Sequence, residues 1–262
     1  MPPSLVGAAM TDLPEPIPAA TLILMRPPRS EGAPEILMIE RSETMAFAAG
    51  ALVFPGGRID PDDHVCGALF GRSLEDGAAR MAAIRETVEE TGIAPALSPA
   101  PDADTARALR AATGGHEAFS EILRRLGLTP MLDSLVPFAR WCPNFRETRR
   151  FDTLFYLAEA PADAAPATAD EGEAVRTFWV AAIDVLRDIE AGRSHAIFPT
   201  RRNLERLSRF SSIEEARADA ARHPVRKITP WVEQREEGRF VCIPEDAGYP
   251  VTAEPFETAR RR

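Results

Sequence analysis

The alternation of apolar and polar residues along the chain predicts strands interleaved with helices. Apolar runs bounded by turn residues predict strands at 20–27, 35–42, 51–57 and 149–160. Helical periodicity predicts helices at 76–92, 116–128, 200–210 and 212–223. Residues 174–192 combine a strand, a turn and a helix, whereas 95–115, rich in Ala, Pro, Asp and Gly, predict a surface excursion. This interleaving indicates an α/β fold.

The helix at 76–92 begins with the acidic Asp76 and ends at Gly92, which are ordinary start and stop signals. At about 100° per residue, Met81, Ile84 and Val88 fall on one stripe of its surface. We therefore expect this stripe to pack inward, against the core of the protein.

Three carboxylates gather on the other side of this helix, because Glu86, Glu89 and Glu90 lie within five positions of one another. Like charges at helical spacing repel by roughly a few tenths of a kcal/mol per pair in water. Arg85 can pair with Glu89 at the i,i+4 spacing. One interpretation is a solvated acidic face. The other is a site for a hard cation, since Mg²⁺ and Mn²⁺ prefer oxygen ligands.

The residues before this helix favour the cation site. The run 51–57 ends in Pro-Gly-Gly, and a double glycine lets the backbone turn sharply and approach a ligand closely. With this turn and Arg-Glu-Thr-Val-Glu-Glu-Thr-Gly at 85–92, the chain resembles the Nudix hydrolases, whose signature is G-x5-E-x7-R-E-(apolar)-x-E-E-x-G-(apolar). Gly57 matches the first position, and residues 85–93 match the last nine.

The resemblance implies a fold, a reaction and a set of site residues. The fold is the Nudix α/β/α sandwich, and the reaction is metal-dependent hydrolysis of a diphosphate linkage in a nucleoside diphosphate derivative. The implied ligands of Mg²⁺ or Mn²⁺ are Glu86, Glu89, Glu90 and the backbone carbonyl of Gly56. Arg85 would orient the glutamates rather than touch the substrate. The general base would be one of these carboxylates or Glu173, six residues before Trp179.

The signature is interrupted in this chain. The family separates its first Gly from its Arg by fourteen positions, but Gly57 and Arg85 are 28 positions apart, so about fourteen extra residues lie between them. We expect this insertion to be a loop. The glutamate that the signature has eight positions before Arg85 is Gly77 here. The candidates for the missing acid are Asp60, Asp62, Asp63, Glu75 and Asp76.

Two further segments resemble the peroxisomal-type coenzyme A diphosphatases and their bacterial relatives. One is 41–57, which contains Arg-Ser and Phe-Pro-Gly-Gly, and the other is 137–161, which contains Arg-Arg-Phe-Asp-Thr after a Trp and a Pro. That branch also carries an insertion inside its signature, but it has an Arg where this chain has Ala46. The implied substrate is coenzyme A or an acyl-CoA. The alternatives are ADP-ribose, a dinucleotide or a nucleotide sugar, or a catalytically silent Nudix domain that senses a ligand.

Four residues of these segments are candidates for contacts with the substrate. Arg149 and Arg150 begin a strand and could hold a phosphate or pair with acidic residues. Trp141, which we expect in a loop, could stack on a purine or pack within the fold. Arg41 is the cation that remains in the segment 41–57.

The resemblance covers roughly 20–210 and suggests how the chain is divided. We expect a flexible N-terminal segment at 1–18 and a Nudix domain at 19–210, with insertions at about 58–76 and 95–135. Residues 211–262 would form a C-terminal extension with extra helices.

Composition excludes several other classes of protein. The net charge of −9, from 31 basic and 40 acidic residues, leaves no basic surface for nucleic acid. No apolar run approaches the length of a membrane span, and no basic and apolar leader is recognisable. Three scattered cysteines predict free thiols in a reducing compartment. We expect a cytoplasmic protein that acts on a small molecule, with a homodimer left open.

Overall fold

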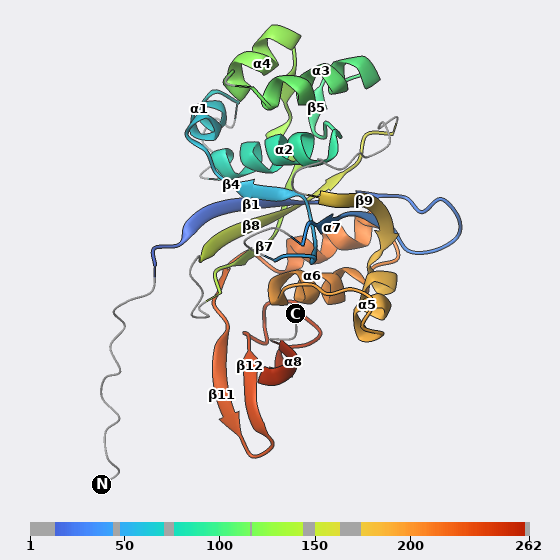
Figure 1. The fold of residues 1–262 in the computed structure, drawn as a ribbon, viewed down its shortest axis with the longest axis vertical. Coiled ribbons are helices and arrows are strands. Elements are labelled where there is room, and N and C mark those ends of the chain that lie inside the picture. Colours follow the sequence, from blue (N-terminus) through green and yellow to red (C-terminus); the bar gives the residue numbers. More distant parts are fainter. Residues whose placement is uncertain are drawn as a thin grey trace.

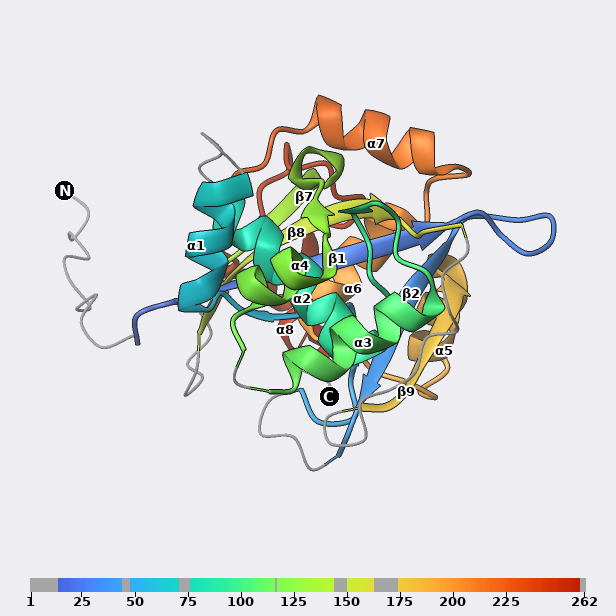
Figure 2. The same ribbon diagram turned by 90° about the horizontal axis from the view of Figure 1, so that it is seen from above.

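A mixed sheet of eight strands forms the centre of the molecule, and helices cover both of its faces (Figures 1 and 2). The computed structural model describes residues 14–43, 48–70, 76–115, 117–143, 150–162 and 174–259. The strands of this sheet are β1 (Ile17–Arg26), β2 (Glu35–Arg41), β3 (Leu52–Val53), β4 (Gly56–Arg58), β7 (Val136–Trp141), β8 (Phe151–Glu159), β9 (Ala174–Ala181) and β10 (Lys227–Ile228). The predicted α/β fold is therefore confirmed.

Strand β1 organises the sheet, because it pairs with three other strands. It runs parallel to β8 along most of its length, from Ile17 beside Phe151 to Met25 beside Glu159. Its last two residues pair antiparallel with the start of β2, and residues 19–21 pair antiparallel with β4. The apolar runs at 20–27 and 35–42 therefore form strands that pair with each other, and β2 and β4 share one edge of β1.

The apolar run 51–57, predicted as one strand, is split into β3 and β4 by Phe54 and Pro55. A proline cannot donate a hydrogen bond to a neighbouring strand, so it favours such a break. The chain changes partner at this point, since β3 pairs with β2 and β4 pairs with β1. The break brings the glycines of β4 next to the beginning of β1.

Strand β1 is buried on both faces, because its side chains alternate between two hydrophobic clusters. Leu22 and Leu24 belong to one cluster, and Ile23 and Met25 belong to the other. The helices over the Leu22 face are α1 (Pro61–Phe70), α2 (Gly77–Thr91), α3 (Ala103–Thr113) and α4 (Phe119–Leu126). The helices over the opposite face are α5 (Ala182–Glu190), α6 (Phe198–Leu207) and α7 (Ile213–Arg222).

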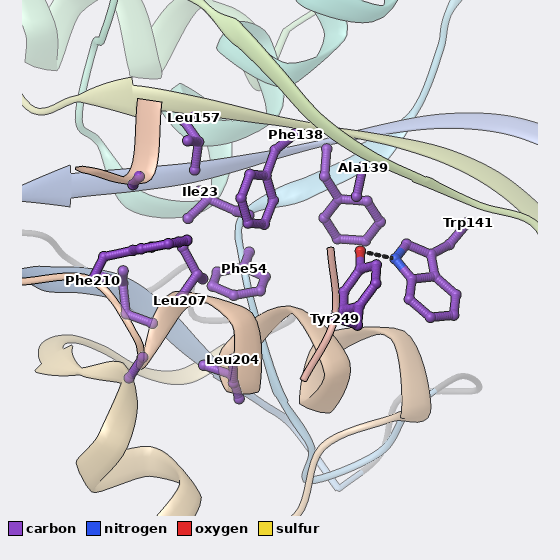
Figure 3. Packing of buried hydrophobic residues seen from close by; sticks show 14 of the residues in the cluster. Ile23, Phe54, Phe138, Ala139, Trp141, Leu157, Leu204, Leu207, Phe210 and Tyr249 are labelled. Carbon is purple, nitrogen blue, oxygen red and sulfur yellow. Dashed lines mark hydrogen bonds between the residues drawn. The ribbon is translucent and has the colours of Figure 1, made fainter. Parts of the chain in front are cut away.

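The segment that follows α7 also belongs to the core. Val241, Ile243 and Tyr249 are buried in the cluster on the α6 face of the sheet. Figure 3 shows Tyr249 beside Trp141, whose indole Nε1 donates a hydrogen bond to the Tyr249 hydroxyl at 2.9 Å. The C-terminal residues therefore help to close the core beneath β7.

Three segments differ from the expectations. The insertion before α2, expected to be a loop, carries α1, and the excursion at 95–115 contains α3. Local hydrogen bonds explain both helices: Asp102 accepts from the Thr105 N–H at 2.8 Å to cap α3, and Asp63 accepts from the Asp60 N–H at 2.8 Å at the start of α1. Trp141, expected in a loop, is the last residue of β7.

The C-terminal extension contains strands as well as the helices that were expected. Besides α7 and α8 (Phe256–Ala259), it forms a separate antiparallel sheet of β11 (Trp231–Arg235), β12 (Gly238–Cys242) and β13 (Ala253–Pro255). A short two-stranded sheet, β5 (Leu97–Ser98) with β6 (Thr129–Pro130), joins the segments around α3 and α4. Among the described residues, no helix combines the length and the apolar character needed to cross a membrane.

Candidate active site

Helix α2 presents its acidic residues to a cavity of about 900 Å³. Met81, Ile84 and Val88 are fully buried, as the periodicity predicted, so the acidic side chains leave the helix on the side of the cavity. The helix ends at Gly92, which takes the left-handed conformation at φ 72° and donates its N–H to the Val88 carbonyl at 2.9 Å. The cavity wall includes Glu86, Glu89 and Glu90.

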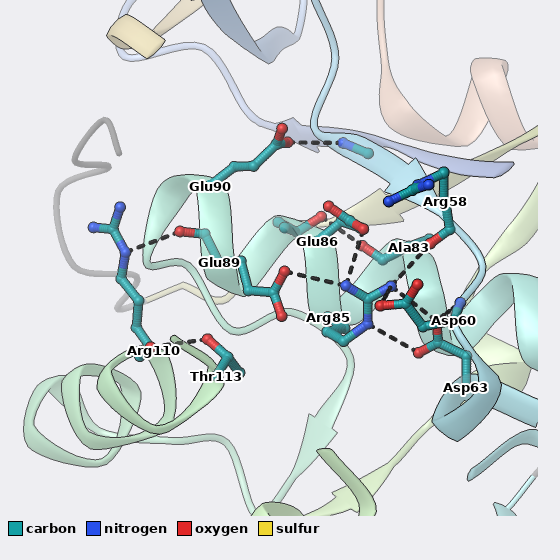
Figure 4. Close-up of polar contacts among 12 residues, drawn as sticks. Arg58, Asp60, Asp63, Ala83, Arg85, Glu86, Glu89, Glu90, Arg110 and Thr113 are labelled. Carbon is teal, nitrogen blue, oxygen red and sulfur yellow. Dashed lines mark hydrogen bonds and ion pairs between the residues drawn. The ribbon is translucent and has the colours of Figure 1, made fainter. Parts of the chain in front are cut away.

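The two glycines of β4 make this arrangement sterically accessible. The Gly56 N–H donates to Oε2 of Glu90 at 2.9 Å (Figure 4). A Cβ atom on Gly57 would lie only 2.4–2.5 Å from the carboxylate of Glu86, and one on Gly56 would lie 2.4 Å from the Ala20 carbonyl oxygen. Any larger residue at either position would displace the glutamates or β1, which gives the Pro-Gly-Gly turn its physical role.

Arg85 lies at the centre of the acidic cluster and uses all five of its N–H donors (Figure 4). Its Nη1 donates to Oε1 of Glu86 at 2.9 Å and to Oε2 of Glu89 at 3.1 Å. Its Nε and Nη2 meet the two carboxylate oxygens of Asp63 at 3.1 and 2.8 Å. Nη2 also donates to the Arg58 carbonyl at 2.9 Å, so Arg85 ties α2 to both β4 and α1.

The cluster carries more negative charge than one arginine neutralises. Burial raises the pKa of Glu86 and raises that of Glu89 to about 7, although the neighbouring Arg85 works in the opposite direction. Burial acts to lower the pKa of Arg85, but its contacts with Asp63, Glu86 and Glu89 outweigh burial and raise it. A surplus of buried carboxylates beside a cavity is a setting in which a bound cation is stabilising.

Comparisons with known proteins agree with this geometry. No family model matches the chain. The acyl-coenzyme A diphosphatases NUDT19 of Xenopus laevis and Gallus gallus are each 25% identical over 82% of this chain, covering 71% and 73% of their own lengths. The crystal structure of a NUDIX hydrolase from Alicyclobacillus acidocaldarius is 29% identical, with a TM-score of 0.68 over 80% of this chain and 97% of that one.

The chain is a Nudix hydrolase. The predicted superfamily, its resemblance to the coenzyme A diphosphatase branch, and the enzyme class of Nudix pyrophosphohydrolase are thereby confirmed. The α/β fold of this chain also agrees with the fold of that solved structure.

The glutamates of the Nudix helix suit a hard divalent cation in their chemistry but do not yet converge on one point. Within the described ranges, no three His, Cys, Asp or Glu side chains are close enough together to hold one ion. Glu90 is turned toward the Gly56 N–H, whereas Glu86 and Glu89 share Nη1 of Arg85. The donor set itself is the one that Mg²⁺ and Mn²⁺ prefer.

Two of the predicted substrate residues, Arg41 and Arg150, line the same cavity. In each, Nε is buried and has no hydrogen-bond partner within the part of the chain that the structure describes. Buried guanidinium N–H groups are costly to leave unpaired, so these two arginines suit an anion from outside the protein. Arg149, a third predicted substrate residue, and Glu173, a candidate for the general base, lie outside the described residues, as does Ala46.

Trp141 lines the cavity but is only 1% exposed. Its ring packs edge-on against Phe198 and Tyr249, with centroids 6.0 and 5.3 Å away. Of the two alternatives for this residue, packing within the fold is the one that these contacts describe, with the indole forming part of the cavity wall.

Sequence reasoning missed two further polar residues of the site, Arg58 and Arg110, and left Asp63 as one of five candidates for the missing acid. Arg58 and Arg110 line the cavity, and Nε of Arg110 donates to the Glu89 backbone carbonyl at 3.1 Å. Asp63 is fully buried against Arg85. Arg110 and Asp63 come from α3 and α1, two helices that were not predicted. The signal for both helices was present as Asp-Pro-Asp-Asp at 60–63 and Pro-Asp at 101–102, since aspartate and proline mark helix starts.

Proposed function

We propose that this Nudix hydrolase cleaves the diphosphate of coenzyme A or an acyl-CoA in a reaction that depends on Mg²⁺ or Mn²⁺. The observation that carries the proposal is the charge pattern of one cavity. Surplus carboxylates from α2 share it with two arginines, Arg41 and Arg150, whose buried Nε atoms have no partner in the described structure. The acids suit a cation, and the arginines suit a phosphate.

In this proposal the cation is held by Glu86, Glu89 and Glu90, with the backbone carbonyl of Gly56. When bound, it would neutralise charge on the diphosphate and lower the pKa of the attacking water. The protein residues do the positioning. Arg85 fixes the rotamers of Glu86 and Glu89 through its shared Nη1 donor, and the Gly56 N–H orients Glu90. A proton acceptor is needed for the water, and the α2 carboxylates and Glu173 are the candidates.

The coenzyme A preference rests on an anion that other diphosphates lack. Coenzyme A carries a 3′-phosphate, which ADP-ribose and NADH do not have, and a guanidinium that meets a phosphate makes a strong, charge-assisted contact. The cavity volume of about 900 Å³ lies within the usual range for small-molecule sites. The names of the NUDT19 relatives support the same substrate class.

A substrate screen tests the proposal. Coenzyme A, 3′-dephospho-coenzyme A, ADP-ribose, NADH and nucleotide sugars are each incubated with the enzyme and Mg²⁺ or Mn²⁺, and the products are identified by mass. We expect 3′,5′-ADP and 4′-phosphopantetheine from coenzyme A. Its kcat/KM should exceed that of the dephospho form by about ten- to a hundredfold, the value of one charge-assisted contact.

Substitution of each arginine tests whether it causes the preference for coenzyme A over 3′-dephospho-coenzyme A. Arg41→Ala or Arg150→Ala should remove it and leave turnover of 3′-dephospho-coenzyme A intact. Arg176→Ala is the matched control, because Arg176 is exposed, pairs with Glu40 and does not line the cavity. Equal cleavage of the two substrates by the unmodified enzyme would show that the 3′-phosphate is not read, and the broader class of nucleoside diphosphate derivatives would replace coenzyme A.

A further inference from the structure

The signature acid that is missing at Gly77 has little room to return at that position. Gly77 is the first residue of α2 and lies against α1 from the insertion. A Cβ atom on Gly77 would be 3.1 Å from the Gly67 carbonyl oxygen, and one on Gly67 would be 2.5 Å from the Ala78 nitrogen. The two helices cross at these glycines, so the support that Arg85 needs has to come from another element.

The insertion itself supplies a carboxylate to Arg85. The two oxygens of Asp63 meet Nε and Nη2 of the guanidinium at 3.1 and 2.8 Å, a bidentate geometry that fixes the plane of the guanidinium as well as its position. Asp63 is fully buried, so water does not screen this pair. The remaining Nη1 is then directed at Glu86 and Glu89.

The other described candidates for the missing acid are engaged elsewhere. Asp62 accepts hydrogen bonds from the N–H and the hydroxyl of Ser120 on α4, both at 2.9 Å. Asp76 pairs with Arg80 at 2.9 Å and accepts from the hydroxyl of Tyr156 at 3.0 Å. Asp60 is 3.7 Å from Arg85, and its side chain is more than half exposed. Glu75 lies outside the described residues.

The local structure of α1 holds Asp63 in this orientation. Pro61 follows Asp60 at the start of the helix, and the Asp63 carboxylate accepts a hydrogen bond from the Asp60 N–H at 2.8 Å. The contacts of Asp62 with Ser120 fasten the same turn to α4. Asp63 therefore approaches Arg85 from a turn that is fixed on two sides.

We propose that Asp63 is the positioning residue of this site: it orients Arg85, and through Arg85 it keeps Glu86 and Glu89 available to a divalent cation. The inference rests on the proposed metal-dependent function. Without the Asp63 carboxylate, the guanidinium loses its two-point contact, and its hydrogen-bonded carboxylates are then Glu86 and Glu89, with the exposed Asp60 at 3.7 Å. Arg85 would then hold these carboxylates more tightly, in competition with the cation.

The test compares two neighbouring aspartates of α1. Mn²⁺ binding to the substrate-free chain is measured by titration calorimetry for the unmodified protein, Asp63→Asn and Asp62→Asn. We expect Asp63→Asn to weaken Mn²⁺ binding by about 10- to 100-fold, as the loss of a supporting residue does in other metal sites. Asp62→Asn is the matched control: its amide oxygen can still accept from Ser120, so the turn stays attached to α4 and Mn²⁺ binding should match that of the unmodified protein. At saturating Mn²⁺, KM for the diphosphate substrate should stay the same in both variants.

A double variant shows whether Asp63 acts through Arg85. If it does, Arg85→Ala combined with Asp63→Asn should bind Mn²⁺ as Arg85→Ala alone does, since the interacting partner is already gone. Additive losses would show a separate structural role and overturn the inference. Thermal unfolding is followed for every variant. If Asp63→Asn does not unfold cooperatively, Asp63→Glu replaces it, which keeps the charge and should weaken Mn²⁺ binding by a smaller factor.

The outcomes separate this inference from the proposed function. If the unmodified chain binds Mn²⁺ and Asp63→Asn binds it equally well, the role of Asp63 is overturned and the metal-dependent function stands. If the unmodified chain does not bind Mn²⁺ at all, both fall together.

Discussion

Two buried arginines of this protein, Arg85 on α2 and Arg202 on α6, lie among carboxylates, but the balance of charge around them differs. Arg85 is within ion-pair distance of four acids, namely Asp60, Asp63, Glu86 and Glu89. Arg202 shares two acids with a second arginine: Arg201 and Arg202 both contact Glu205 and Glu254. The first cluster carries surplus negative charge, whereas the second is balanced.

The surroundings of the two clusters differ in the same sense. The carboxylates on α2 face the cavity, so a ligand can supply the positive charge that balances them. The Arg202 network joins α6 to β13 and faces other protein groups, with Arg202 only 1% exposed. A buried network that is neutral in itself indicates a structural role, and one with surplus charge beside a cavity indicates a binding site.

The arginine pKa values show the same contrast. Burial lowers the pKa of Arg202, the neighbouring charge of Arg201 lowers it further, and the two acids that they share do not compensate. The pKa of Arg85 is instead raised, because its acidic neighbours outweigh burial. The number of carboxylates per arginine, rather than burial alone, decides the sign.

The largest expected effect is on stability. Arg202→Met should lower the free energy of unfolding by about 3–5 kcal/mol, because it leaves Glu205 and Glu254 buried without their main partner. Urea unfolding measures this change. Arg201→Met is the control within the same network: its side chain is 24% exposed, so water can compensate and the loss should be smaller. A stable Arg202→Met variant that has lost activity would place this network in the active site instead.

Replacing Glu by Gln should lower kcat in the α2 cluster and lower stability in the Arg202 network. Glu89→Gln and Glu90→Gln should each lower kcat by at least about a hundredfold, or about 2.7 kcal/mol, while unfolding normally, because each removes a charge that the cation needs. Glu254→Gln is the matched control and should lower stability while leaving kcat within a fewfold. Wild-type turnover of Glu90→Gln at saturating Mg²⁺ would rule out the metal site.

The acidic helix could be predicted from sequence because every local signal agreed. Its apolar stripe, its glycine stop and its signature residues all indicated one orientation, and Met81, Ile84 and Val88 are buried accordingly. The proximity of Arg41 and Arg150 could be suspected only from the resemblance, since strands far apart in sequence bring them to one cavity.

The insertion helix α1 was missed for a physical reason. Its apolar residues Val65 and Leu69 are 51% and 64% exposed, whereas Asp63, Cys66 and Gly67 form its buried side. The usual rule that the apolar face is the inner face therefore gives the wrong answer. Asp63 is buried because it pairs with Arg85, and that partner is 22 positions away along the chain.

The C-terminal strands were missed because their pattern does not alternate. Every residue of β11 is exposed, including Trp231 and Val232, so no buried face marks it as a strand. Its pairing with β12, and that of β12 with β13, depends on contacts between segments rather than on a local period.

A smaller effect is expected in the pH dependence of stability. Burial raises the pKa of Glu205 to about 7, although Arg202 and Arg201 oppose it. An unfolded chain ionises this group near its ordinary pKa of 4.5, so the native state holds the proton more tightly. The stability of the wild type relative to Glu205→Gln should therefore fall as the pH rises from about 4.5 to about 7. Above this window the difference should stay constant.

Urea unfolding of both proteins at several pH values gives this difference directly. Glu121→Gln, at an exposed position of α4, is the control and should leave the slope with pH unchanged. A difference that grows in favour of the wild type with rising pH would mean that the two arginines outweigh burial at Glu205.

The smallest effect expected is the stabilisation of the intact protein by a cation. A ligand that binds only the native state raises the free energy of unfolding by RT ln(1 + [L]/Kd), or about 1.4 kcal/mol when Mn²⁺ is present at ten times its Kd. For a chain of this size the rise in Tm should be about 3–6 °C, measured by thermal unfolding with and without a chelator. Glu254→Gln should start from a lower Tm and keep this rise, because its network is not exposed to the cavity. Glu90→Gln should start near the wild-type Tm and lose the rise, because the surplus charge on α2 has been reduced. If both variants keep it, Mn²⁺ binds elsewhere on the protein, and the contrast in charge between the two clusters does not mark the site.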